Sequence, residues 1–204
     1  MWPWEHVVVG YVAYSLFVHL AHRDSPGALD TVAVVVASVL PDLIDKPLAW
    51  EFGVFESGYA LGHSILFAIP LAIVVGLATS RLGRPRVGIA FAVGYLLHLP
   101  ADVLDGYVRG GHLDWGILLW PVETGSGYHQ HGGFLDQFEA LLAQYRAELL
   151  SGDPSTYVLA QLGLAAFAVV LWLADGAPVV REAIAGSVRL VRSALAGAEP
   201  SSRR

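Results

Sequence analysis

Two aspartates within a long apolar segment constrain this chain more than any other feature. Residues 28–50 are largely apolar, yet Asp42 and Asp45 lie among them, in the motif LPDLIDKP. A carboxylate at membrane depth costs at least a few kcal/mol, so such a residue is a candidate functional group. At helical spacing both carboxylates share one face, where they repel each other unless a proton or a cation lies between them. Alternatively, the pair caps a helix or pairs with Lys46.

The composition indicates a membrane protein. Of the 204 residues, 55% are hydrophobic and 15% are charged, and the mean hydropathy is positive, which excludes an ordinary soluble domain. About 20 apolar residues cross a bilayer. Five segments are long enough: 6–22, 28–50, 59–80, 87–105 and 156–174. We therefore predict an all-α fold, a polytopic membrane helical bundle with about five transmembrane helices. The chain has no cysteine, which excludes thiolate ligands.

The distribution of basic residues predicts the orientation. The short loop 81–86 carries three arginines and is therefore expected on the cytoplasmic side. Alternation of the spans then places the amino terminus and segment 106–155 outside, and the carboxyl terminus in the cytoplasm. Nine of the twelve Lys and Arg residues fall inside; the exceptions are Lys46, Arg109 and Arg146. Because topology explains these charges and the net charge is −6, nucleic-acid binding is not expected.

Polar residues from four of the predicted helices share one depth. A helix rises about 1.5 Å per residue, so each of these residues lies roughly 17 to 25 Å from the cytoplasmic end of its span. They are His6, Asp42, Asp45, His63, His98 and Asp102. Imidazole and carboxylate together suit zinc, manganese or iron. We predict that these six residues bind one or two divalent metal ions, zinc first and manganese as the alternative, in the outer third of the membrane.

Three prolines lie close to these residues. Pro41 and Pro47 flank Asp42 and Asp45, and Pro100 lies between His98 and Asp102. Proline removes a backbone hydrogen bond and favours a kink. Because irregular backbone at membrane depth is tolerated where it lines a polar cavity, the second helix is expected to break near the aspartates.

The same residues occur in motifs that resemble those of a known family. In chain order the motifs are His6 at the start of the first span, LPDLIDKP at 40–47, GHS at 62–64, HLPAD at 98–102 and LWP at 119–121. Over residues 1–125 the chain resembles the membrane-bound metal-dependent hydrolases, whose bacterial members include an inner-membrane protein of the SOS response. The resemblance implies that the six residues above bind metal and that the protein is a hydrolase.

One motif departs from that family pattern. Many members carry a His-Arg pair shortly before the His-Ser motif, whereas residues 56–62 of this chain contain neither residue type. Either one ligand is missing, or Glu51 or Glu56 replaces it.

Two functions remain open at the level of the sequence. The leading interpretation is a metal-dependent hydrolase that acts at the extracytoplasmic side on a lipid or lipid-linked substrate, with a phosphoester as the favoured bond. In it Asp45 or Asp105 would act as general base. The alternative is a non-enzymatic metal-binding membrane protein, or an ion or proton carrier, since paired acids and histidines also form proton relays. The inner halves of spans one, three and four are apolar apart from His19, which favours a site open to one side.

The outer segment 106–155 has two recognisable parts. Apolar residues recur with helical period over 134–150, which predicts an amphipathic helix on the outer surface. This helix is either a lid over the site or a helix that packs on the bundle. Before it, the glycine-rich stretch 125–133 contains His129 and His131, a pair that is usually incidental in such a loop.

The chain divides into two parts. Residues 1–176 are expected to form a single membrane-embedded unit that contains the metal site. Residues 177–204 mix aliphatic residues with Arg181, Arg189 and Arg192. This pattern predicts a cytoplasmic amphipathic tail with a basic helix at the membrane surface.

Overall fold

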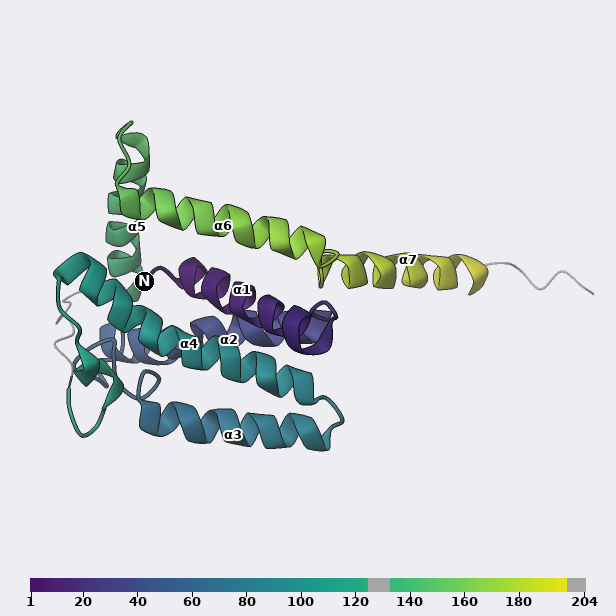
Figure 1. The fold of residues 1–204 in the computed structure, drawn as a ribbon, viewed down its shortest axis with the longest axis horizontal. Coiled ribbons are helices and arrows are strands. Elements are labelled where there is room, and N and C mark those ends of the chain that lie inside the picture. Colours follow the sequence, from purple (N-terminus) through teal and green to yellow (C-terminus); the bar gives the residue numbers. More distant parts are fainter. Residues whose placement is uncertain (125–132, 198–204) are drawn as a thin grey trace, which may run out of the picture.

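A computed structural model describes residues 1–124 and 133–197 as an assembly of helices (Figure 1). The elements are α1 (Pro3–His22), α2 (Ala28–Trp50), α3 (Ile65–Arg81), α4 (Pro85–Gly110), the 3-10 helix η1 (Trp115–Leu118), α5 (Phe134–Leu150), α6 (Thr156–Ala174) and α7 (Val180–Gly197). The described part of the chain contains no strand, which confirms the all-α prediction. His129, His131 and residues 198–204 lie outside the described residues.

Helix α4 occupies the centre of the bundle. It packs against α1, α2 and α3, while α6 packs against α1. Figure 1 shows α5 lying across the end of the bundle that contains the amino terminus, and α7 extending away beyond the far end of α6. Helix α5 has the bounds that its apolar period predicts, residues 134–150.

Small residues allow α1, α2 and α4 to approach closely. A Cβ atom at Gly94 of α4 would lie 2.5 Å from the carbonyl oxygen of Val34 in α2. A Cβ atom at Gly10 of α1 would collide with Ser38 Oγ and would lie 3.5 Å from Gly94 Cα. Small residues at such crossings favour close helix packing in membranes. The buried apolar residues form two clusters. One comprises Tyr11, Tyr14, Val18, Val34 and Ala90. The other comprises Ala37, Ala68, Tyr95, Leu99, Val103, Ile117 and Leu118.

The structure corrects two expectations near the predicted site. Helix α2 is continuous through Pro41 and Pro47, and α4 is continuous through Pro100, so the predicted break is wrong. Packing of α2 against both α1 and α4 maintains the helix although each proline lacks a backbone donor. Helix α3 begins at Ile65 rather than at residue 59. Ser64 starts it as the N-cap, because its side chain accepts a hydrogen bond from the Leu66 N–H at 3.2 Å.

Length and composition identify two candidate membrane spans among the described helices, α4 and α6. Helix α3 is apolar but has only 17 residues. Helices α1 and α2 include charged residues or histidines, and His6, Asp42 and Asp45 among them belong to the site described below. A bundle of five spans is therefore not confirmed by helix length and composition.

The close crossing of α2 and α4 can be tested with two glycines of one helix. We expect Gly94→Ala to lower the free energy of unfolding by about 1–3 kcal/mol, because the added methyl group meets the α2 backbone. Gly106→Ala is the matched control, since a Cβ atom there would have no neighbour within 4 Å and alanine favours the helix. Thermal unfolding in detergent, followed by circular dichroism, measures both. Equal midpoints would contradict the close approach.

Candidate metal centre

Four buried side chains from three parts of the chain converge near the end of the bundle that contains the amino terminus. They are Asp42 of α2, His63 of the loop before α3, and His98 and Asp102 of α4. One nitrogen or oxygen atom from each lies within 4.8 Å of the others, so the four can hold a metal ion. None of the four exposes more than 4% of its surface. The structure thus joins four of the six residues that share one depth in the sequence.

The distances within this group are short. His63 Nε2 lies 3.1 Å from His98 Nε2 and 3.2 Å from Asp102 Oδ2. His98 Nε2 lies 3.3 Å from the same Asp102 oxygen. Asp42 Oδ1 lies 3.5 Å from His63 Nε2 and 3.7 Å from His98 Nε2. Both imidazole Nε2 atoms therefore lie 3.2–3.7 Å from oxygens of the two carboxylates.

Partners on the other side of each imidazole ring define its tautomer. His98 Nδ1 lies 2.7 Å from the Ser38 carbonyl oxygen, which only accepts, so Nδ1 carries the hydrogen. His63 Nδ1 lies 2.8 Å from Asp45 Oδ2, and the same reasoning applies. In each neutral ring Nε2 is then an acceptor. With both rings neutral, the two imidazole nitrogens and the two carboxylates face one another as acceptors, and a proton or a cation at their centre relieves the repulsion.

Unpaired polar atoms provide an independent sign of a ligand. His6 is buried, and its ring stacks on that of His98 with centroids 3.6 Å apart. Its Nε2 lies 3.2 Å from Asp102 Oδ1, yet neither ring nitrogen makes a hydrogen bond within the described structure. Asp42 Oδ2 also lacks a hydrogen-bond partner within the described structure, whereas Oδ1 lies 2.7 Å from Lys46 Nζ. Because an unsatisfied buried polar group costs about 1–3 kcal/mol, bound metal would stabilise these residues, and the nitrogen and oxygen ligands fit a divalent ion.

The ion pair considered in the sequence is also present. Lys46 Nζ lies 2.7 Å from Asp42 Oδ1. Asp42 therefore faces Lys46 on one side and the two histidines on the other, so the pairing does not remove it from the group.

Asp45 has a different environment from Asp42. Its oxygens accept hydrogen bonds from the backbone N–H groups of Ala60 and Gly62 at 2.8 Å and of His63 at 3.0 Å, in addition to His63 Nδ1. The group of four does not include it. This geometry favours an orienting role for Asp45, which fixes the ring of His63, over the roles of metal ligand and general base expected from the sequence.

Neighbouring elements hold the loop that carries His63. A Cβ atom at Gly62 would lie 2.8 Å from the Pro41 carbonyl oxygen, so only glycine fits between the loop and α2. The Tyr95 hydroxyl donates to the Gly62 carbonyl at 2.7 Å, and Ser64 Oγ donates to the Trp120 carbonyl at 2.5 Å. No sequence motif marks Tyr95 or the Ser38 carbonyl, because a tyrosine and a backbone oxygen within apolar helices have no recognisable sequence pattern.

Asp105 lies at the rim of the group rather than within it. It forms ion pairs with Arg109 Nε at 2.9 Å and with the Met1 amino group at 3.0 Å, and it accepts a hydrogen bond from the Tyr157 hydroxyl at 2.5 Å. The amino group also lies 2.9 Å from Asp102 Oδ1. Burial opposes its charge, but the carboxylates of Asp102 and Asp105 raise its pKa above the ordinary value.

A polar cavity of about 600 Å³ adjoins this rim. Asp102, Asp105 and Arg109 line one side of it, and Gln137 and Leu141 of α5 line another. Helix α5 also packs on the bundle through aromatic contacts, since the rings of Trp50 and Phe134 stack with centroids 5.9 Å apart, and the rings of Trp2 and Phe138 meet edge to face at 6.4 Å. The helix thus both packs on the bundle and covers the cavity.

Neither of the two glutamates considered as replacement ligands belongs to the group of four. Glu51 Oε2 accepts a hydrogen bond from the Phe134 N–H at 3.2 Å, which is the start of α5. Glu56 is exposed. Glu51 therefore serves the attachment of α5 rather than the metal group.

Comparison with known proteins adds the family. A family model described as YdjM inner membrane protein matches residues 1–179, well over half of the chain. The chain belongs to the YdjM inner membrane protein family. It is therefore a membrane protein, and the family match confirms the resemblance noted in the sequence, whose motifs all lie within the matched residues. No curated protein and no solved structure matches the chain.

The orienting role of Asp45 in this YdjM family member predicts a graded effect on metal binding. Asp45→Asn keeps the shape of the side chain but turns an amide donor toward backbone donors, and loosens His63. We expect zinc affinity to fall about 10- to 100-fold, as for other residues that orient a ligand. Asp24→Asn, an exposed site at the other end of the bundle, is the matched control. Zinc titration of the detergent-purified protein gives both values, and equal affinities would refute the role.

Proposed function

We propose that the protein is a metal-dependent hydrolase that cleaves a lipid or lipid-linked phosphoester at the extracytoplasmic side of the membrane. The main support is the convergence of four buried side chains, Asp42, His63, His98 and Asp102, whose potential ligand atoms lie within 4.8 Å of one another. The membrane family of the chain and the polar cavity beside Asp102 agree with a substrate drawn from the bilayer.

The residues have distinct proposed roles. His63, His98, Asp42 and Asp102 bind one or two divalent ions, zinc first and manganese as the alternative, with His6 as a further ligand. When bound, such an ion supplies a Lewis acid and lowers the pKa of a coordinated water. Asp45 and the Ser38 carbonyl orient the two imidazoles.

Charged residues at the rim suit a phosphoester. Arg109 lines the polar cavity, and its guanidinium can pair with a phosphate group. Hydrolysis joins the water oxygen to phosphorus and breaks the ester P–O bond. Asp105, which lines the same cavity, accepts the water proton and passes it to the departing alcohol.

The membrane arrangement belongs to the same proposal. We infer five spans, α1, α2, α3, α4 and α6, with the amino terminus outside and the carboxyl terminus in the cytoplasm. Large apolar side chains exposed on three of these helices support contact with lipid, among them Val32, Val36, Leu66, Ile73, Val74, Leu159 and Val170. Residues 1–176 form the embedded unit. In α7, the exposed Val180, Ile184 and Val188 recur every four residues, and Arg181, Arg189 and Arg192 lie on the same helix, as expected of a basic helix on the cytoplasmic membrane surface.

One observation favours the alternative of a proton carrier. Asp175, at the end of α6, is buried, and it accepts hydrogen bonds from Tyr11 at 2.6 Å and Ser15 at 2.7 Å. His19 Nε2 lies 2.7 Å from its second oxygen. Tyr11, Ser15 and His19 of α1 thus form a polar row between the metal group and the other end of the bundle. The same hydrogen bonds also attach α1 to the end of α6.

Two ligand variants test the hydrolase. We expect His98→Ala and Asp42→Ala to lose bound metal and to reduce phosphoester hydrolysis in phospholipid vesicles to background, because each removes one of the converging acceptors. His22→Ala, an exposed histidine, serves as the control and should retain both properties. Elemental mass spectrometry and phosphate release give the two measurements. If the unmodified protein hydrolyses no lipid above the level of empty vesicles but conducts protons, and His19→Ala abolishes that proton flux, the carrier is correct.

The absence of cysteine permits a clean test of orientation. Single cysteines at His112 and at Arg84 report on the two ends of α4, and both positions are exposed. We expect a membrane-impermeant maleimide to label His112→Cys in intact spheroplasts, and Arg84→Cys only after the membrane is disrupted. The reverse pattern would place the metal group on the cytoplasmic side.

A further inference from the structure

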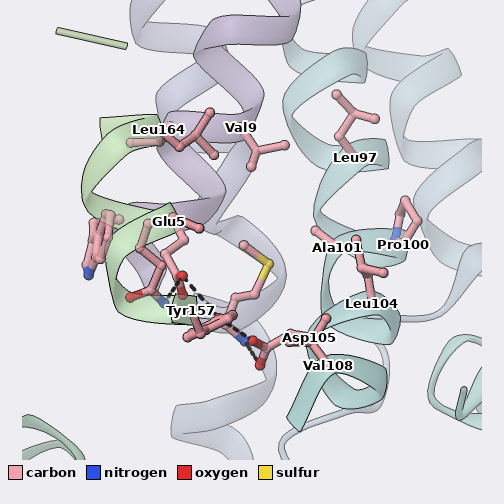
Figure 2. A pocket seen from close by; sticks show the side chains of 15 residues that line it. Glu5, Val9, Leu97, Pro100, Ala101, Leu104, Asp105, Val108, Tyr157 and Leu164 are labelled. Carbon is pink, nitrogen blue, oxygen red and sulfur yellow. Dashed lines mark hydrogen bonds and ion pairs between the residues drawn. The ribbon is translucent and has the colours of Figure 1, made fainter. Parts of the chain in front are cut away.

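An apolar cavity of about 380 Å³ lies between α1, α4 and α6 (Figure 2). Figure 2 shows Val9 and Leu164 on one side, and Leu97 and Leu104 on the other. Ala101 and Ala160 also line it and leave the space open because their side chains are small. Its volume falls within the range of about 300–1,000 Å³ that is usual for ligand sites.

The apolar cavity adjoins the polar cavity beside the metal group. Asp105 lines both, and Asp102, one helical turn away, lines the polar one. Figure 2 shows Glu5, Tyr157 and Asp105 together at one end of the apolar cavity. A single molecule with an apolar chain and a polar head can therefore occupy both spaces, with its polar part next to the metal ligands.

An unpaired acceptor marks the polar end of the apolar cavity. Gln161 is 6% exposed and lines the space. Its Nε2 donates to Glu5, but its Oε1 has no hydrogen-bond partner within the described structure. A hydroxyl or amine donor from a bound molecule would satisfy this oxygen, which an all-hydrocarbon occupant would not.

The lining of the cavity suits a lipid chain. Apolar side chains form most of its wall, and Glu5, Asp105 and Tyr157 lie together at one end. A flexible aliphatic chain with a polar head matches this distribution, and the membrane supplies such molecules. Helix α6 packs on α1, and only Val158, Gln161 and Ala168 of its described residues are buried, so α6 leaves the lipid access to the cavity.

We propose that this cavity binds one aliphatic chain of the lipid substrate and presents its head to the metal group. This inference rests on the proposed function and specifies its substrate class: a membrane lipid whose polar head carries the phosphoester and whose chain enters between α4 and α6. The lateral position of the cavity, outside the polar residues of the bundle, allows the lipid to enter without leaving the bilayer.

A photoreactive lipid tests the inference. The full chain is reconstituted in vesicles of phosphatidylethanolamine and phosphatidylglycerol that include phosphatidylglycerol with a diazirine in one acyl chain. After irradiation, mass spectrometry maps the lipid adducts. We expect adducts on Leu97, Leu104 and Leu164, and a decrease of about fivefold or more in Ala160→Phe, whose ring occupies the cavity. Adducts on outward residues of α6, such as Leu162, should not change.

Ala166→Phe, an exposed position on the same helix that does not line the cavity, is the matched control and should label like the unmodified protein. Equal labelling of the cavity residues in both phenylalanine variants would overturn the inference. The absence of adducts on these residues, as expected if a second copy or a partner fills the cavity, would also overturn it.

The test separates this inference from the proposed function, because cross-linking needs neither metal nor turnover. His98→Ala should therefore give the same cavity adducts as the unmodified protein. Adducts in a protein that binds no metal would support the lipid site and refute the hydrolase. Lipid hydrolysis that persists without the adducts would support the hydrolase and refute the cavity as its lipid site.

Discussion

The mutual repulsion of four buried acceptors is the constraint that governs the rest of this structure. Two imidazole Nε2 atoms and two carboxylates meet within 4.8 Å of one another, and an acceptor at each Nδ1 holds the ring with its Nε2 toward the group. Such an arrangement is costly without a proton or a cation between the four groups. The close crossing of α1, α2 and α4 at Gly10, Ser38 and Gly94 supplies the rigid packing that keeps these groups together.

Asp42 and Asp45, which lie in one helical turn, have different contacts. Asp42 faces the two histidines and pairs with Lys46 through Oδ1, whereas Asp45 accepts hydrogen bonds from three backbone N–H groups and one imidazole. One carboxylate is thus available to a metal, and the other holds the loop that delivers His63. This division explains why two acidic residues lie side by side within an apolar helix.

Two cavities with opposite character meet at Asp105. The polar one, beneath α5, contains the charged rim of the metal group, and the apolar one, between α1, α4 and α6, is open to the membrane. Their junction gives the site the amphiphilic character of a lipid. The proposed phosphoester hydrolase would need its polar reaction centre separated from hydrocarbon yet within reach of a lipid head, and Asp105 in the wall of both cavities is consistent with this proposal.

The amino-acid sequence was sufficient to predict the helical fold, the bounds of α2, α5 and α6, and the common depth of the polar residues, because each follows from local periodicity and helical rise. It was also sufficient for the family, through motifs in a fixed order. The tertiary structure was needed to distinguish Asp45, which contacts Nδ1 of His63, from Asp42, which faces its Nε2. The two aspartates lie on the same face of α2 and differ only in the residues that pack against them. The tertiary structure was likewise needed to show that α2 and α4 continue through their prolines, and that Ser38 and Tyr95 support the site, because these depend on contacts between helices distant in the chain.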